Sequence, residues 1–349
     1  MDMLDIYTDY LICQNKYATA TGLSELVDGE FSHDKVTRFL RENDYGPKCL
    51  WLYVKNPVRQ HENDDGVLTL DDCIEEKPYT DENPVNCWHY SHAKGGVVKG
   101  INILSCMVRY DDFSVPVGYE VVKKDIQYCD VKTKQQRRKS SVTKNELFRN
   151  LIDQAVKNEV LFKYVLADNW FGSKANMAHI HNDLQKSFII GIKSNRTLAL
   201  TENDANNGKY AQVRELDIEE DVAITVWLKG LDFPVKLLKK VFKNENGSIG
   251  VLYLISNDMH SSADRLYEVY QKRWRIEEFH KSIKQNASLA KSPTKKVKTQ
   301  CNHIFAAMIA YCKLEMLKIK TNLNHFAIKY KLLLRANQIA MRELKNMTG

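Results

Sequence analysis

Several common sequence features are missing from this chain of 349 residues. No apolar run reaches the roughly 18 residues that a membrane-spanning helix requires, so we expect no membrane partner. The first ten residues, MDMLDIYTDY, are acidic and lack the pattern of a signal peptide. Internal repeats and low-complexity tracts are absent as well. The sequence therefore predicts a globular, cytoplasmic protein of two or three domains.

Cysteine pairs with metal-binding spacing are also absent. The eight cysteines are scattered, and none belongs to a C-x-x-C pair. A zinc ribbon is therefore not expected, and neither is a disulfide framework in a cytoplasmic chain of this length. What the sequence does have is an excess of positive charge, since its formal net charge is +7. That balance favours a polyanionic partner.

Two basic stretches contain no acidic residue. Residues 131–144, VKTKQQRRKSSVTK, include Arg137 and Arg138, and residues 281–298, KSIKQNASLAKSPTKKVK, contain six lysines. Runs of this kind suit the phosphate backbone of a nucleic acid, so we predict that Arg137 and Arg138 contact DNA. A solvated surface loop is the alternative interpretation for either run.

The N-terminal residues have the pattern of helices. Residues 20–43 predict a helix, a turn at Gly29, and a second helix with Ser32 as its N-cap. The second helix would expose Lys35 and Arg38, which could contact DNA if this helix enters a major groove, as in a helix-turn-helix. An ordinary two-helix hairpin with polar faces has the same pattern.

Strand and helix patterns then alternate along the chain. A polar stretch at residues 56–66, with Pro57 and Gly66 as breakers, predicts a domain boundary. Beyond it, the order predicts a mixed α/β sheet with flanking helices over residues 63–290. Residues 196–246 interrupt this order with short strands and turns, which predicts a β-rich insertion. We therefore predict an N-terminal helical domain (1–62), the α/β domain with its insertion, and a C-terminal helical region (291–349).

Acidic residues end two of the predicted strands. The stretch VLTLDD ends in Asp71 and Asp72, and the stretch VLAD ends in Asp168. Buried carboxylates are costly unless they are paired, hydrogen-bonded or bound to a cation. Together with a third carboxylate they would form an oxygen-rich site for Mg²⁺ or Mn²⁺. Turn or capping aspartates are the alternative interpretation.

One helical stretch, YQKRWRIEEFHKSIK (270–284), has a narrow polar strip beside its apolar face. At roughly 100° per residue, four of its residues fall within about 60° of the helical wheel. They are Tyr270, Arg273, Glu277 and Lys284. Glu278 lies about 80° from Tyr270 and outside this strip. The wheel thus favours Glu277 over Glu278 as the third carboxylate, although a salt-bridged surface helix could have a similar pattern.

These residues resemble the signature of a known family. The spacing Y-x-x-R-x-x-x-E-x-x-x-x-x-x-K and the stretches RWRIEEFHK and LADNWF are similar to bacterial insertion-sequence DDE transposases of the "insertion sequence four" group. The resemblance spans about residues 66–290. It implies a ribonuclease-H-like core in which three acids bind two divalent ions, Mg²⁺ or Mn²⁺. It also implies a β-rich insertion between the second and third acids.

The resemblance assigns the acids one by one. Asp168 matches the second acid and Glu277 the third. The family pattern aligns Asp71 with the first acid, but Cys73 stands where the family usually has a hydroxyl residue. That departure leaves open whether Asp71 or Asp72 is the first acid.

The resemblance also implies contacts with DNA. Tyr270, Arg273 and Lys284 match the residues that contact phosphates near the cleaved transposon end. Some relatives stack an aromatic residue of the insertion on a flipped base, and Trp227 is a candidate for that position. A core tryptophan is the alternative interpretation of Trp227.

The activity that the resemblance implies is DNA transposition. A strand would be cut at the element's end, and the freed 3′ hydroxyl would attack target DNA. The implied partners are double-stranded DNA at the transposon ends and target, and a second copy of the chain in a DNA-bound homodimer at the bacterial nucleoid. Two alternatives are a metal-dependent nuclease of the same fold and a domesticated or decayed copy that only binds DNA.

Overall fold

The centre of the molecule is a large mixed sheet, as a computed structural model describes it for residues 2–243, 245 and 247–348. The strands are β1 (Val67–Glu76), β2 (Asn86–Ser91), β3 (Gly96–Tyr110), β4 (Phe113–Val121), β5 (Ile126–Cys129), β6 (Gln136–Lys139), β7 (Tyr164–Ala167), β8 (Ser187–Ile192), β9 (Thr197–Ala199), β10 (Ala211–Gln212), β11 (Ala223–Leu228), β12 (Val235–Lys243) and β13 (Ile249–Ser256). Eleven of these described strands form one sheet in the order β10-β9-β11-β12-β13-β8-β7-β1-β3-β2, with β4 also paired to β3. The mixed α/β sheet that the sequence predicted is therefore confirmed.

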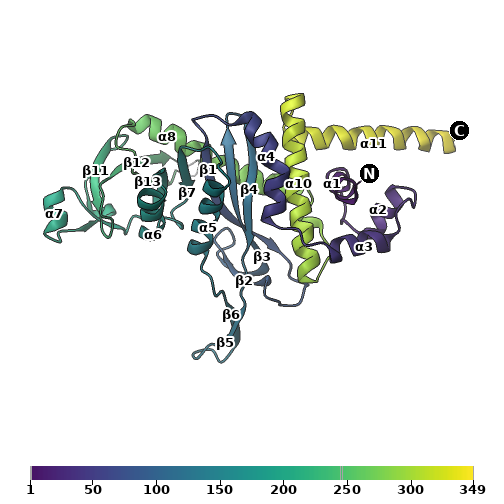
Figure 1. Ribbon diagram of the computed structural model, residues 1–349, viewed down its shortest axis with the longest axis horizontal. Coiled ribbons are helices and arrows are strands. Elements are labelled where there is room, and N and C mark those ends of the chain that lie inside the picture. The colour runs from purple at the N-terminus through teal and green to yellow at the C-terminus, as the bar shows by residue number, and fades with distance from the viewer. Residues whose placement is uncertain (1, 244, 246, 349) are drawn as a thin grey trace.

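Helices flank the sheet and extend the molecule at one end (Figure 1). They are α1 (Met3–Cys13), α2 (Ala20–Leu26), α3 (His33–Glu42), α4 (Pro47–His61), α5 (Lys144–Lys157), α6 (Lys174–Ala178), α7 (Glu202–Asn206), α8 (Ala263–Gln271), α9 (Arg275–Gln285), α10 (Val297–Thr321) and α11 (His325–Thr348). Helix α10 packs against β4 as well as against α1 and α3, so it joins the sheet to the N-terminal helices. Among the described helices, none has the length and apolar character needed to cross a membrane.

Side chains of β1 and β7 alternate between two apolar clusters on opposite faces of the sheet. The two strands are parallel neighbours, and Val67 of β1 pairs with Tyr164 of β7. Both of these residues pack with Leu266 and Val269 of α8 in the smaller cluster. Leu68, one residue further along β1, belongs instead to the larger cluster. Period-two alternation thus assigns each residue of these strands to one face.

The predicted insertion, residues 196–246, is rich in strands that continue the main sheet. Strand β12 pairs antiparallel with β13, and β13 pairs antiparallel with β8. Strands β11, β9 and β10 follow outward from β12. The segment therefore widens the sheet at the edge away from β1 (Figure 1).

The N-terminal helices form with the cap and turn that the sequence predicted, but Pro57 does not act as predicted. The Ser32 side chain accepts a hydrogen bond from the Lys35 N–H at 3.3 Å and caps α3, and Gly29 adopts a φ of 77° in the turn. Pro57, predicted to be a breaker within the boundary stretch 56–66, lies inside α4. That interpretation of Pro57 is wrong because α4 packs against β4, and tertiary packing can offset the roughly 3 kcal/mol cost of an internal proline.

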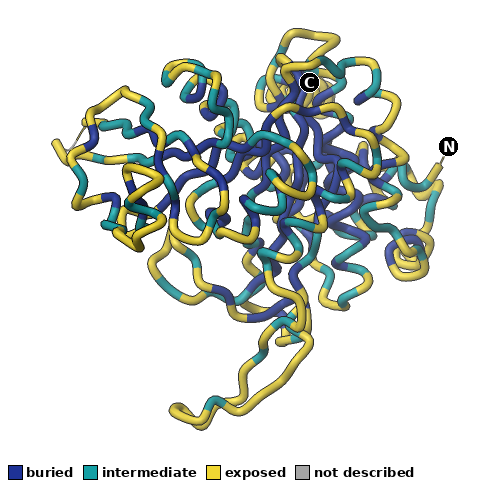
Figure 2. Tube along the Cα trace, turned by 60° about the vertical axis from the view of Figure 1, so that its left-hand side comes forward, coloured by how far each residue is buried: buried dark blue, intermediate teal, exposed yellow. Residues whose placement is uncertain are grey.

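The first basic run, residues 131–144, contributes to a projecting hairpin. For this run the sequence left open a DNA contact or a solvated surface loop. Strand β5 pairs antiparallel with β6, with Ile126 opposite Lys139. The hairpin extends away from the main sheet in Figure 1, and most of its trace is exposed in Figure 2. Arg137 and Arg138 therefore lie on a strand of this hairpin.

Candidate active site

Asp71 and Asp168 lie at the same level on two neighbouring parallel strands. Thr69 of β1 is paired with Leu166 of β7, and each aspartate follows two residues later. Because side chains alternate with a period of two, Asp71 shares a face of the sheet with Val67. Helix α8 packs on that face, and α9 contacts β1. Asp168 thus follows the end of β7, while Asp71 lies in the middle of β1. The predicted strand end at Asp71 and Asp72 is wrong, because pairing with β3 continues β1 to Glu76.

The negative charges of Asp168 and Glu277 both affect the pKa of Asp71. The pKa of Asp71 is raised to about 8, first by burial and then by the charges of Asp168 and Glu277. The backbone N–H of Asp72 donates to Asp71 Oδ1 at 2.8 Å, which only partly offsets the shift. The backbone N–H of Trp170 donates to Asp168 Oδ1 at 3.0 Å. A divalent cation would relieve this repulsion, because a nearby positive charge favours the ionised carboxylates.

Glu277 approaches from the helical layer. Helices α8 and α9 follow one another through a single 3₁₀ turn at Lys272–Trp274. The apolar face of α9 is buried through Ile276, Phe279 and Ile283, which fixes the orientation of the helix. A carboxylate oxygen of Glu277 lies within 4.8 Å of one from Asp71. Glu277 therefore lies beside Asp71, and the charge of Asp168 also acts on Asp71.

Tyr270, Arg273 and Lys284 surround this group. Arg273 Nη1 lies 3.5 Å from Glu277 Oε1, and the guanidinium carbon lies 5.6 Å from the centre of the Tyr270 ring. Burial raises the pKa of Tyr270, and the charge of Arg273 opposes that shift. Lys284 Nζ donates to the carbonyl oxygen of Ile74 on β1 at 2.6 Å. These contacts hold the polar strip of the helix against β1.

Asp72 has a different environment from Asp71. Both of its carboxylate oxygens accept hydrogen bonds from Lys144 Nζ at 3.0 Å, and it also accepts one from the Asn102 side chain. Lys144 begins α5, whose buried residues belong to the larger apolar cluster and which packs against β3 and β4. Asp72 thus has a cation of its own, while Asp71 faces two other acids.

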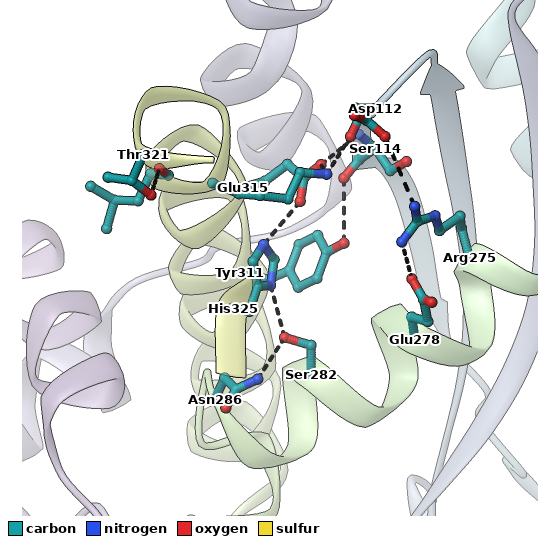
Figure 3. A network of polar contacts seen from close by, with 12 residues as sticks. Asp112, Ser114, Arg275, Glu278, Ser282, Asn286, Tyr311, Glu315, Thr321 and His325 are labelled. Carbon is teal, nitrogen blue, oxygen red and sulfur yellow. Dashed lines mark hydrogen bonds and ion pairs between the residues drawn. The ribbon is translucent and has the colours of Figure 1, made fainter. Parts of the chain in front are cut away.

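Glu278 shows the same contrast with Glu277. Its carboxylate pairs with Arg275, whose guanidinium also lies 3.9 Å from Asp112 (Figure 3). The same side of α9 meets α10 and α11, where Glu315 Oε2 lies 2.9 Å from His325 Nε2 (Figure 3). Glu278 therefore belongs to a compensated network between helices.

One residue beside the acids was missed by the sequence reasoning. A ring nitrogen of His280 lies within 4.8 Å of carboxylate oxygens of both Asp71 and Glu277. Burial lowers the pKa of His280 to about 3, and the charge of Lys284 lowers it as well. The signal that could have found this residue is its position three residues after Glu277, which places both side chains on one side of the helix.

The other predicted DNA-contacting residues lie on separate surfaces. Lys35 and Arg38 are exposed on α3, beyond α10 as seen from β1 (Figure 1). Arg137 and Arg138 lie on β6 of the projecting hairpin. Trp227 is partly buried on β11, in the widened part of the sheet. The fold does not gather these five residues at the acids.

Two family comparisons identify the class of protein. Residues 1–216 match the family described as DDE superfamily endonuclease. Residues 131–313 match the family described as Transposase DDE domain. Each match covers more than half of the chain, so the protein belongs to the DDE transposase and endonuclease superfamily.

Comparison with individual proteins adds little to this assignment. No curated protein gives a significant match. Among solved structures, the chain is similar to the Drosophila P element transposase strand transfer complex, with 12% identity and a TM-score of 0.26. The similarity covers 54% of this chain and 37% of that chain. We draw nothing further from so partial a likeness.

Proposed function

We propose that this protein is a DNA transposase that cleaves strands at the ends of a mobile element and joins them to target DNA. The observation that supports this most is the convergence of Asp71, Asp168 and Glu277, with the pKa of Asp71 raised to about 8 after burial and the charges of the other two. The Tyr-Arg-Glu-Lys spacing supports membership of the "insertion sequence four" group, with a ribonuclease-H-like core over residues 63–290 and action at the bacterial nucleoid.

The three acids fit divalent cations, and we propose Mg²⁺, with Mn²⁺ as a substitute. Carboxylate oxygens are the donors that these ions prefer. When bound, two such ions would activate the attacking oxygen and stabilise the leaving oxygen of a phosphodiester. The chain contributes position, because paired strands hold Asp71 and Asp168 at one level and a buried helix face directs Glu277 toward them.

Three neighbouring side chains are proposed to hold the phosphates of the cleaved strand. Arg273 can donate two parallel N–H bonds to a phosphate while its guanidinium stays over the Tyr270 ring. Lys284 offers a point charge, and the Tyr270 hydroxyl can donate one further hydrogen bond. Arg273 lies beside Glu277, and Lys284 is held against β1 at Ile74, so a phosphate bound by these side chains would lie near the acids.

A groove beside the hairpin is proposed to hold further DNA. It measures about 410 Å³ and lies between β2 and the β5–β6 hairpin. Aromatic rings and basic side chains both line it, notably Trp88, Tyr90, Lys124, Tyr128, Arg137 and Arg138. Aromatic faces stack bases and basic groups hold backbone phosphates, so this lining suits a nucleic-acid strand.

The terminal regions are proposed to recognise DNA and to assemble the complex. In the helical region 1–62, exposed Lys35 and Arg38 would contact the double-stranded terminal repeats. In the region 291–349, α11 exposes apolar side chains, including Leu344 at 60% and Met347 at 84%. Exposed apolar surface favours burial against a partner, so we propose that α11 helps to form a homodimer on DNA.

A strand-transfer assay tests the proposal. Duplexes from the DNA that flanks the coding sequence would be labelled and mixed with the full-length protein, Mg²⁺ and a target plasmid. We expect cleavage at one defined position and labelled strands joined to the plasmid. Cutting without joining would indicate a nuclease, and binding without cutting would indicate a decayed copy.

Salt dependence tests the hairpin separately. Replacing both Arg137 and Arg138 by alanine should remove two phosphate contacts and reduce the slope of log K against log salt by about two. Replacing the exposed Lys157 and Lys163 by alanine, on a different surface, should leave the slope unchanged. Equal slopes for wild type and the arginine variant would rule out the hairpin as a backbone contact.

A further inference from the structure

His280 is buried beside the candidate metal-binding acids and is not part of the predicted acid triad. Only 8% of its surface is exposed. One of its ring nitrogens lies within 4.8 Å of carboxylate oxygens from Asp71 and Glu277. Its Nε2 atom is buried and has no hydrogen-bond partner among the described residues.

A buried imidazole nitrogen without a partner is unfavourable. Leaving a buried polar atom unsatisfied costs about 1–3 kcal/mol, so such atoms usually meet a donor, an acceptor or a ligand. Other buried histidines of this chain have protein partners. For example, His303 Nδ1 lies 2.9 Å from the Tyr7 hydroxyl. His280 thus differs from an ordinary core histidine.

The position of His280 on α9 matches a known arrangement of metal ligands. It follows Glu277 by three residues, so both side chains lie on the same side of the helix. A Glu-x-x-His pair on a helix supplies two ligands to one ion in carboxylate-rich metal sites of helical bundles. Ligands of one ion at bond lengths near 2.1 Å lie at most about 4.2 Å apart. The observed spacing requires only small side-chain movements to reach that limit.

We propose that His280 is a ligand of the divalent ion held by Asp71 and Glu277, so that this ion has a mixed nitrogen and oxygen donor set. The proposal rests on the proposed metal-dependent function and adds a donor to it. Asp168 and Asp71 would supply only oxygen to the second ion. The two ions would therefore differ in their ligands.

The mixed donor set has a consequence for metal preference. Oxygen donors suit Mg²⁺ and Ca²⁺, while an imidazole nitrogen favours transition ions. The ion beside His280 should therefore exchange readily for Mn²⁺ or Co²⁺. Loss of His280 should weaken Mn²⁺ binding more than Mg²⁺ binding, whereas a purely structural role would weaken both alike.

Pulsed electron paramagnetic resonance of the full-length protein loaded with Mn²⁺ alone tests this. We expect a coupling to ¹⁴N from a bound imidazole, which changes to the ¹⁵N pattern when histidine is ¹⁵N-labelled. His280→Gln should remove the coupling and weaken Mn²⁺ binding at least about tenfold. His89→Gln is the matched control, since His89 is also buried but has Cys87 Sγ 3.3 Å from its Nε2. That variant should keep the coupling.

The outcomes separate this proposal from the proposed function. Mn²⁺ that binds through Asp71 without any nitrogen coupling, or a coupling that persists in His280→Gln, overturns the role of His280 alone. Absence of any Mn²⁺ binding that depends on Asp71 overturns the metal-dependent function as well. If His280→Gln does not fold, the ¹⁵N-labelled wild type still shows whether histidine nitrogen binds the ion.

Discussion

Two pairs of adjacent acids in this protein have opposite surroundings. Asp71 and Glu277 face each other across the contact between β1 and α9, and Asp71 carries a raised pKa as a result of burial and nearby negative charge. Asp72 and Glu278, the next residues in each element, pair with Lys144 and Arg275. Asp72 and Glu278 thus each have a close cation, while Asp71 and Glu277 face each other, and Glu277 has a longer contact of 3.5 Å with Arg273.

The backbone geometry explains the contrast. Successive residues of a strand point to opposite faces, so Asp72 cannot share the face of Asp71. Successive residues of a helix are about 100° apart, which turns Glu278 away from β1 and toward α10 and α11 (Figure 3). Acids beside each other in the sequence thus reach different environments without any change in residue type.

The largest expected effect is on cleavage by the two glutamate variants. Glu277→Gln should lower the cleavage rate on the order of 10³-fold or more, because it removes one charged oxygen ligand of the divalent ions. Glu278→Gln should cleave within a few-fold of wild type and lose only about 0.5 kcal/mol of stability, since its pair with Arg275 is half-exposed. Single-turnover cleavage of labelled end DNA measures both. The reverse order of activities would contradict the assignment.

A smaller effect is expected on the pH dependence of stability without metal. The pKa of Asp71 is about 8 in the folded protein and has an ordinary value of 3.8. The folded state therefore holds this proton longer, and stability falls as pH rises from about 4 to about 8. Asp71→Asn removes this loss, so at pH 8 it should be more stable than metal-free wild type by on the order of a few kcal/mol.

Thermal unfolding in a chelator, at several pH values, measures this difference. Asp72→Asn is the matched control and should keep the wild-type fall with pH, since Lys144 faces that carboxylate. Adding Mn²⁺ should restore stability to the wild type at pH 8 but not to Asp71→Asn. A flat profile for metal-free wild type would contradict the crowding of acids around Asp71.

The smallest expected effect is on stability, at the ion pair between Lys144 and Asp72. Lys144→Met should cost about 1–2 kcal/mol, because it leaves the partly buried Asp72 without its cation and removes a contact 4.2 Å above the Trp170 ring. Combined with Asp72→Asn, the loss should be less than the sum, with a coupling of about 1 kcal/mol. Denaturant unfolding of the four proteins gives this cycle. Additive losses would mean that the pair does not interact.

Much of the fold could be predicted from local patterns, and its exceptions have physical causes. The second helix predicted within residues 20–43 forms as α3, with Ser32 as its N-cap. Pro57 misled the prediction because packing on β4 overrides its local cost. The β5–β6 hairpin was missed because its strands are polar and exposed, so they show no apolar alternation.

The candidate site was also partly predictable from local patterns. The helical wheel distinguished Glu277 from Glu278, since the apolar stripe of α9 identifies its buried side within the sequence itself. Asp71 and Asp72 could not be distinguished in this way, because they are neighbours on the same strand and the sequence does not say which of them α9 will approach. His280 escaped notice because a single histidine next to an apolar stripe resembles a core residue.

The sequence by itself determined the elements, their faces and the polar strip of α9, since these depend on periodicities within a few turns or strand residues. Only the tertiary structure decided that Asp71 faces Asp168 and Glu277 while Lys144 takes Asp72. The physical reason is that parallel register between β1 and β7, and the packing of α9 across β1, join residues far apart in the chain. Local periodicity carries no information about such contacts.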